Sequence, residues 1–169
     1  MREPDSWQTF MWNTFFAVAA GASATLAGLV IVAVSVNINR ILQHPQLPAR
    51  AGAAVATLIL ILLSSMATLI PQPTRILGAE LLFFGISCWA LEIYSSRKSI
   101  EARAQSHRPW HESVLQVVFG QLQTLPFIGG GAWMLLNNPN GLYAIAFGIL
   151  VIFFASTANA WVLMVEILR

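Results

Sequence analysis

Residues 13–36 read NTFFAVAAGASATLAGLVIVAVSV, a stretch that contains no charged side chain. The hydrocarbon core of a bilayer is about 30 Å thick, and a helix rising about 1.5 Å per residue needs about 20 apolar residues to cross it. This stretch is long enough. Because backbone groups in lipid must be hydrogen bonded within their own segment, the sequence predicts a spanning α-helix here.

The composition of the whole chain supports the same interpretation. Of its 169 residues, 57% are hydrophobic and only 9% are charged, whereas a soluble domain carries about a quarter charged residues. Such a chain cannot cover a water-facing surface of this size. The composition therefore predicts an integral membrane protein whose main partner is the lipid bilayer.

Four further runs are long and apolar enough to span a membrane. Short turn-forming sequences such as QHPQLP, PQPT and NNPNG separate the runs. We expect a single all-α transmembrane domain over residues 1–169, a polytopic bundle of five spanning helices. The expected spans are 13–36, 51–70, 76–95, 114–136 and 142–165.

The basic residues predict the orientation of this bundle. Lys and Arg gather on the cytoplasmic side of bacterial membrane proteins. With the N-terminus outside, seven of the nine Lys and Arg residues lie on the cytoplasmic side and two, Arg2 and Arg75, lie outside. We therefore expect an outside N-terminus and a cytoplasmic C-terminus. The basic residues are scattered singly along the chain, so no nucleic-acid partner is expected.

The one substantial polar segment, SRKSIEARAQSHRPWHES at 96–113, is expected to be a cytoplasmic loop. Its first half could continue the preceding helix and end before Pro109. Its charges either fix the topology alone or also form a docking surface for a partner. His107 and His111 have the spacing of two metal ligands on a helix, but Pro109 between them disfavours that helix, and no metal site is predicted.

The residue patterns of common enzymes are absent from the sequence. It holds no Walker motif, no HExxH and no Ser/His/Asp set placed for nucleophilic attack. We therefore predict no catalytic residue, no cofactor and no enzyme activity. The single cysteine, Cys88, excludes an intramolecular disulfide and is expected to be a small packing residue.

Glu80 is the most unusual residue within a predicted span, because a carboxylate is costly in hydrocarbon. Three interpretations stay open. Its side chain reaches the headgroups, or it pairs with Arg75, Asn13 or Thr14, or it forms an ion or proton site near the outer mouth of the bundle. Glu92 lies near the inner end of the same span and is expected at the membrane interface.

The first span carries small residues at three- and four-residue steps, so they share one helix face. Small residues let two helix backbones approach closely, and this packing drives association in lipid. The stripe predicts a tight contact with a helix of the same protomer or of another one. Its members include Gly21, Ala24 and Gly28, together with Ala17, Ala20 and Ala27.

The fourth span contains GQLQTLPFIGGG at 120–131. Pro126 cannot donate a backbone hydrogen bond and is expected to kink the helix. Gln116, Gln123 and Thr124 lie on or at the edge of one polar face, which also holds Gly130 and Gly131. That face either contacts other helices, or lines a permeation path, or belongs to a re-entrant segment. The candidate contacts are Ser156, Thr157 and Asn159 of the fifth span and Thr25 of the first.

The first half of the chain resembles a family of small bacterial multi-spanning membrane proteins. The similarity rests on GASATLAGLVIVAVSVNINRIL at 21–42, PQLPARA at 45–51, IPQP at 70–73 and GAELL at 78–82. Most members have no assigned function, and some are labelled modulators of the membrane protease FtsH. The resemblance implies a multi-pass protein of the bacterial plasma membrane, and it implies no catalytic residue.

Two functions follow as hypotheses. The first is a non-enzymatic accessory or regulatory membrane protein that acts through helix packing and its basic 96–113 segment, with itself or another membrane protein as partner. The second is a small oligomeric channel or transporter. Its polar path would use Gln116, Gln123, Thr124, Glu80 and Asn159.

Overall fold

The computed structural model describes residues 4–36, 38, 47–104 and 110–168, and side chains over 10–36, 38, 48, 51–97 and 120–158. These residues form α-helices and contain no strand, so the all-α prediction is confirmed. The helices are α1 (Pro4–Val36), α3 (Leu47–Leu69), α4 (Thr74–Ala104), α5 (Trp110–Leu135) and α6 (Gly141–Leu168).

Four of these helices are long and apolar enough to cross a membrane. The apolar stretches lie at Phe10–Val36 in α1, Ala51–Leu69 in α3, Thr74–Arg97 in α4 and Gly141–Ala158 in α6. The fifth helix, α5, is not among them, and the side chains at 111–119 in its first half lie outside the described part of the chain. A membrane-embedded helix bundle is therefore supported, while the fifth span remains a prediction.

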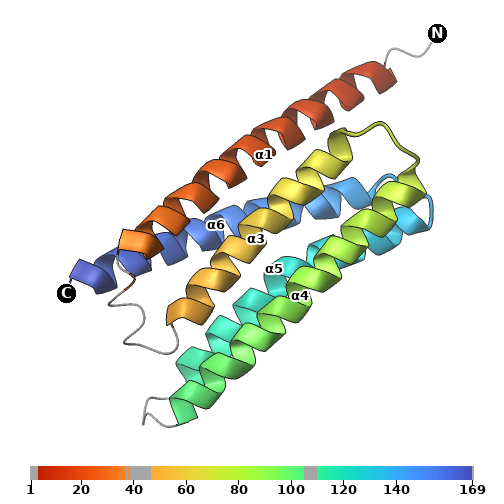
Figure 1. Ribbon diagram of the computed structural model, residues 1–169. Helices are drawn as coiled ribbons and strands as arrows, with labels where there is room; N and C mark the ends of the chain where they lie inside the picture. Colours follow the sequence, from red (N-terminus) through yellow and green to blue (C-terminus); the bar gives the residue numbers. More distant parts are fainter. Residues whose placement is uncertain (1–3, 37, 39–46, 105–109, 169) are drawn as a thin grey trace.

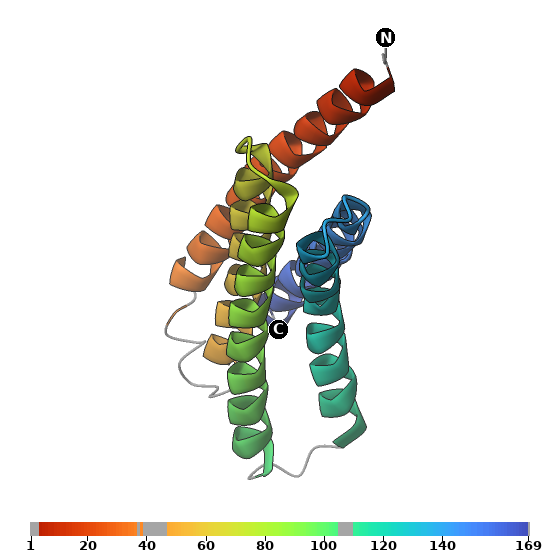
Figure 2. The ribbon, with the colours of Figure 1, turned by 90° about the vertical axis from the view of Figure 1, so that its right-hand side faces the viewer.

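Consecutive helices pack side by side along the chain (Figure 1). The most extensive contacts join α4 to α5 and α1 to α3, followed by those of α5 with α6 and α3 with α4. A smaller contact between α3 and α6 brings the later helices back against the earlier ones. The N-terminal end of α1 projects past the other helices in both views (Figure 2).

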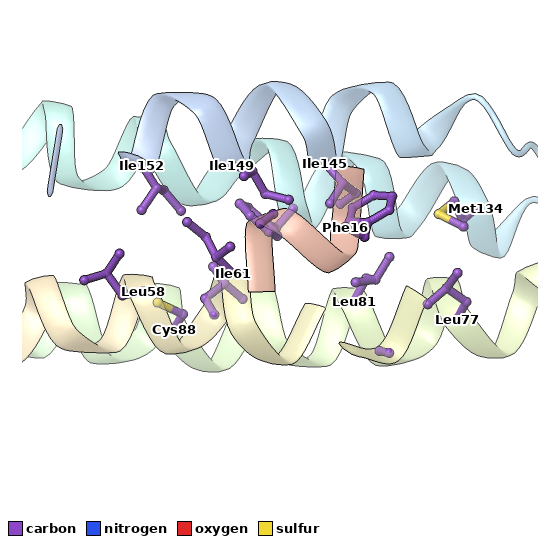
Figure 3. Close-up of a cluster of buried hydrophobic side chains, with 14 of the residues drawn as sticks. Phe16, Leu58, Ile61, Leu77, Leu81, Cys88, Met134, Ile145, Ile149 and Ile152 are labelled. Carbon is purple, nitrogen blue, oxygen red and sulfur yellow. The ribbon is translucent and has the colours of Figure 1, made fainter. Parts of the chain in front are cut away.

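The centre of the bundle is filled by large apolar side chains from every helix (Figure 3). Phe16 of α1 and Ile145 and Ile149 of α6 face Ile61 of α3 and Leu81 of α4. All five have no exposed surface. In a membrane protein such close packing, rather than exclusion from water, holds the helices together.

Glycine residues mark the places where the later helices cross. A Cβ on Gly131 of α5 would lie 2.7 Å from the backbone nitrogen of Leu82 in α4, and one on Gly78 of α4 would lie 2.6 Å from that of Leu135. Gly130 of α5 meets Gly141 of α6 in the same way, because a Cβ on Gly130 would lie 2.8 Å from the Gly141 carbonyl oxygen. Only glycine fits such close backbone contacts.

The turn-forming residues between the helices start and end them. Between α3 and α4, the carbonyl of Pro73 accepts hydrogen bonds from the amides of Ile76 and Leu77 at the start of α4. After α5, Asn137 takes a positive φ of 65°, the left-handed conformation that commonly ends a helix and that asparagine tolerates. The side chain of Asn138 then accepts a hydrogen bond from the Asn140 amide.

The segment 96–113 differs in part from the expected loop. Its first half continues α4 to Ala104, as one interpretation of the sequence anticipated, and its last residues begin α5 at Trp110. His107 and Pro109 lie outside the described residues, as does any loop between the two helices. α5 continues as an α-helix through Pro126.

Candidate functional site

A carboxyl group is buried between α4 and α5. Glu92 of α4 is only 4% exposed, and its Oε1 accepts a hydrogen bond from Nε2 of Gln123 in α5 at 3.3 Å. A polar pair inside an apolar bundle is uncommon, because each polar group loses its hydration. This pair is the most unusual chemical feature in the described part of the chain.

The second carboxyl oxygen of Glu92 has no hydrogen-bond partner, although it too is buried. It lies toward Gly120 of α5, where an added Cβ would be 3.9 Å away. Gly120 therefore leaves room beside the carboxyl without supplying a side chain to bond it. A buried polar oxygen without a partner calls for an explanation, since most such groups are paired.

The sequence placed Glu92 near the membrane interface, and the structure adds that its side chain is buried between two helices. α4 continues beyond the expected end of the span to Ala104, so Glu92 lies within the helix and faces α5. The signal that could have found the pair was Gln123 itself, a midspan amide that needed a polar partner on another helix.

Gln123 therefore makes an interhelical contact, with a different partner from those the sequence suggested. Ser156 of α6 is buried and Thr157 donates to the carbonyl of its own helix at Phe153. Thr124, next to Gln123, is fully buried and donates to the carbonyl of Gln121. The side chains of Gln116 and Asn159 lie outside the described residues.

The glycines and proline of GQLQTLPFIGGG shape the contacts of α5 with both neighbours. Gly131 meets α4 and Gly130 meets α6, while Gly129 has nothing within 4 Å of where its Cβ would be. Pro126 lies against Gly148 of α6, whose added Cβ would be 3.0 Å from the proline Cβ. Close packing against two helices therefore accounts for these residues.

Glu80 lies at the other end of α4 and is tied to the connection that precedes it. Its Oε2 accepts a hydrogen bond from Nε2 of Gln72 at 2.8 Å, and the same amide group donates to the carbonyl of Ala67 at 3.1 Å. Of the groups that the sequence proposed, Asn13 is exposed, and the hydroxyl of Thr14 donates to the carbonyl of Phe10. Glu80 thus joins α3 to α4.

Four of the six small residues in the α1 stripe face away from the bundle. Ala17, Gly21, Ala24 and Gly28 are exposed, and neither glycine has an atom within 4 Å of where its Cβ would be. A different face of α1 packs inward. That buried face carries Phe16, Ala19, Ser23 and Val30. Ala27, at the edge of the stripe, packs against the core, whereas Gly21 and Gly28 make no tight contact within the protomer.

No group of three or more His, Cys, Asp and Glu side chains that could hold a metal is found among the described residues. Cys88 lies buried in the core, one helical turn before Glu92. The chemistry that the Glu92 and Gln123 pair offers is that of a single carboxyl oriented by an amide. Such a group can accept or release a proton.

Comparisons with known proteins give no family model, no curated protein and no solved structure that matches this chain. The resemblance over roughly residues 14–95 therefore remains an expectation.

Proposed function

We propose that this chain is a five-span accessory protein of the bacterial plasma membrane, without enzyme activity. In this proposal it acts by packing the small-residue face of α1 against a transmembrane helix of another chain. The N-terminus lies outside and the C-terminus in the cytoplasm. The observation that carries the proposal is the open face of α1, where Gly21 and Gly28 have no neighbour.

The contrast with the other glycines supports this function. Gly78, Gly130, Gly131 and Gly141 each lie where two helix backbones meet. Gly21 and Gly28 have the same small size, and with Ala17 and Ala24 they repeat the small-xxx-small pattern that joins transmembrane helices. The face is thus suited to a close helix contact that the protomer does not supply.

The surface and charge of the bundle support its place in a membrane. Large apolar side chains are exposed on each helix, among them Leu29, Met66, Phe83, Leu122 and Phe154. The C-terminal part of α4 carries the basic residues Arg97, Lys98 and Arg103. Basic residues at a span end favour the cytoplasmic side.

The packed interior favours helix association over conduction through the bundle axis. Most of the described side chains that meet there are apolar and have almost no exposed surface, and apart from Glu92 the buried polar ones carry only the hydroxyls of serine and threonine. The buried Gln123 and Glu92 pair is the observation that favours the second candidate, a channel or transporter. In that case Gln123→Leu would alter ion flux into liposomes while the fold is retained.

Disulfide crosslinking tests the proposed contact, because the chain has one native cysteine that can be removed as Cys88→Ala. In that background, Ala24→Cys in native membranes should form an oxidant-dependent disulfide with a second copy or, beside a partner cysteine, with that partner. Helices that meet at small residues bring Cα atoms within the roughly 4.4–6.8 Å that a disulfide needs.

Leu29→Cys is the matched control. Leu29 is also exposed on α1, but it lies about 110° around the helix from the stripe, taking about 100° per residue. The proposal expects several-fold more adduct at position 24 than at position 29. Equal yields at both positions, or none at either, would contradict it. The mass of the adduct separates a second copy from a different membrane protein.

A further inference from the structure

We infer that the carboxyl of Glu92 is a proton-binding site at the contact of α4 and α5, and that Gln123 positions it. This inference concerns a different part of the molecule from the α1 face. A negative result for the α1 contact would not affect the Glu92 proposal, and a negative result for Glu92 would not affect the α1 proposal.

The burial of Glu92 is the first step. An isolated carboxylate in an apolar interior is strongly disfavoured, so buried carboxyl groups are paired with a cation or carry a proton. In the described part of the chain, the carboxyl of Glu92 accepts one hydrogen bond, from Gln123, and forms no ion pair. A bound proton is the simplest way to neutralise the group.

The two oxygens of the carboxyl have different roles. Oε1 is occupied by the amide of Gln123, whereas the buried Oε2 has no partner and lies beside Gly120. The proton would therefore reside on Oε2, transferred from a hydronium ion that becomes water. A neutral hydroxyl there is far less costly than an unpaired charge.

A metal ion fits this place less well than a proton. Divalent cations such as Mg²⁺ and Ca²⁺ take about six or more oxygen ligands. Next to Glu92 the described residues supply one further side-chain amide, that of Gln123, and no cluster of metal-binding side chains is found among them. The ligand class is accordingly the proton.

Among the described side chains, few ionisable groups lie near this carboxyl. On α4, Cys88 precedes it by one helical turn, and Tyr94 and Arg97 follow it. On α5, the adjacent Gly120 and Gln123 do not ionise, and the described side chains of α3, residues 51–69, include no ionisable group.

Proton exchange has a short route from one end of the span. Glu92 precedes Arg97, the first basic residue after it in α4, by a helical rise of about 7–8 Å at about 1.5 Å per residue. The carboxyl is thus buried by its neighbours yet close to water. This position suits a group that equilibrates with the pH on one side of the membrane.

Labelling with dicyclohexylcarbodiimide, an apolar reagent that adds to protonated carboxyl groups, tests the inference on the full chain in liposomes. Peptide mass spectrometry should find the adduct at Glu92, with a yield that falls about tenfold per pH unit above its midpoint. Glu92→Gln should abolish this adduct, and Glu80→Gln should leave it unchanged. In Gln123→Leu, which removes the donor to the carboxylate, labelling should persist to higher pH.

Infrared spectroscopy gives a readout that does not depend on access of the reagent. A carboxylic-acid C=O band should disappear as the pH is raised in the native chain and be absent from Glu92→Gln. If neither the band nor the adduct is found at Glu92 between about pH 5 and about pH 9, the inference is wrong. Protection of Glu92 by Na⁺ or K⁺ at fixed pH and ionic strength would instead indicate a metal-cation site and overturn it.

Discussion

Gly131 of α5 lies directly against Gly78 of α4, because a Cβ built on Gly131 would be 3.0 Å from the Gly78 carbonyl oxygen. The neighbouring Gly130 makes an equivalent contact with Gly141 of α6. Two adjacent residues thus set the approach of two different helices to α5. Gly130 and Gly131 thus allow close packing of a helix that lies between two others, whereas Gly129 faces open space.

Gly131→Ala should destabilise the bundle. The added methyl group would meet the backbone of Leu82 at 2.7 Å, and a backbone cannot yield as a flexible side chain can. We expect a loss of about 1–3 kcal/mol in the free energy of unfolding, measured by denaturant titration in detergent micelles. Gly129→Ala is the control, since nothing lies within 4 Å of it. Equal losses in the two variants would refute this account of the crossing.

The contact between Gly148 and Phe127 should show energetic coupling. A Cβ on Gly148 would lie 2.8 Å from Cε2 of the fully buried Phe127 ring. Gly148→Ala should therefore destabilise the native chain more than it destabilises a Phe127→Leu background, where the ring is gone. A double-mutant cycle on unfolding free energies should give a coupling of at least about 0.5 kcal/mol. If the losses of unfolding free energy in the two single variants simply add up in the double variant, the ring does not limit the space at Gly148.

Gln72→Leu should weaken the connection between α3 and α4. The variant loses the hydrogen bonds that Gln72 donates to Glu80 and to the carbonyl of Ala67. At about 0.5–1.5 kcal/mol per bond, the loss in unfolding free energy should be about 1–3 kcal/mol. Glu80→Gln keeps an acceptor oxygen for Gln72, so it should cost less. A larger loss in Glu80→Gln would mean that the charge of Glu80, and not this bond, matters.

Ser65→Ala should leave stability unchanged or raise it by up to about 1 kcal/mol. The hydroxyl of Ser65 is buried without a hydrogen-bond partner, so its removal relieves an unsatisfied polar group. The matched variant is Ser23→Ala, because Ser23 is equally buried but donates to the carbonyl of Ala20. That variant should lose about 0.5–1.5 kcal/mol in the same unfolding measurement. The reverse order would show that Ser65 has a partner after all, for example water.

Much of the local structure could be predicted from the sequence. Long apolar runs require helices in lipid, and the turn residues between them end those helices, as Asn137 does after α5. α3 ends at Leu69, one residue before the expected end at 70, but it begins at Leu47, four residues before the expected start at 51. The sequence left open whether α4 extends to Ala104. Polar residues that follow an apolar span can form either a loop or a further stretch of helix in water.

The partners of each helix face were decided only in the tertiary structure. From sequence alone, Gly21 and Gly131 have the same packing role, yet one lies open and the other is wedged between backbones. Glu92 and Gln123 are 31 residues apart, and their meeting follows from how α4 and α5 cross. The physical reason is that lipid and protein interior are equally apolar, so periodicity does not separate the two faces of a spanning helix. Shape complementarity between distant segments selects the contacts.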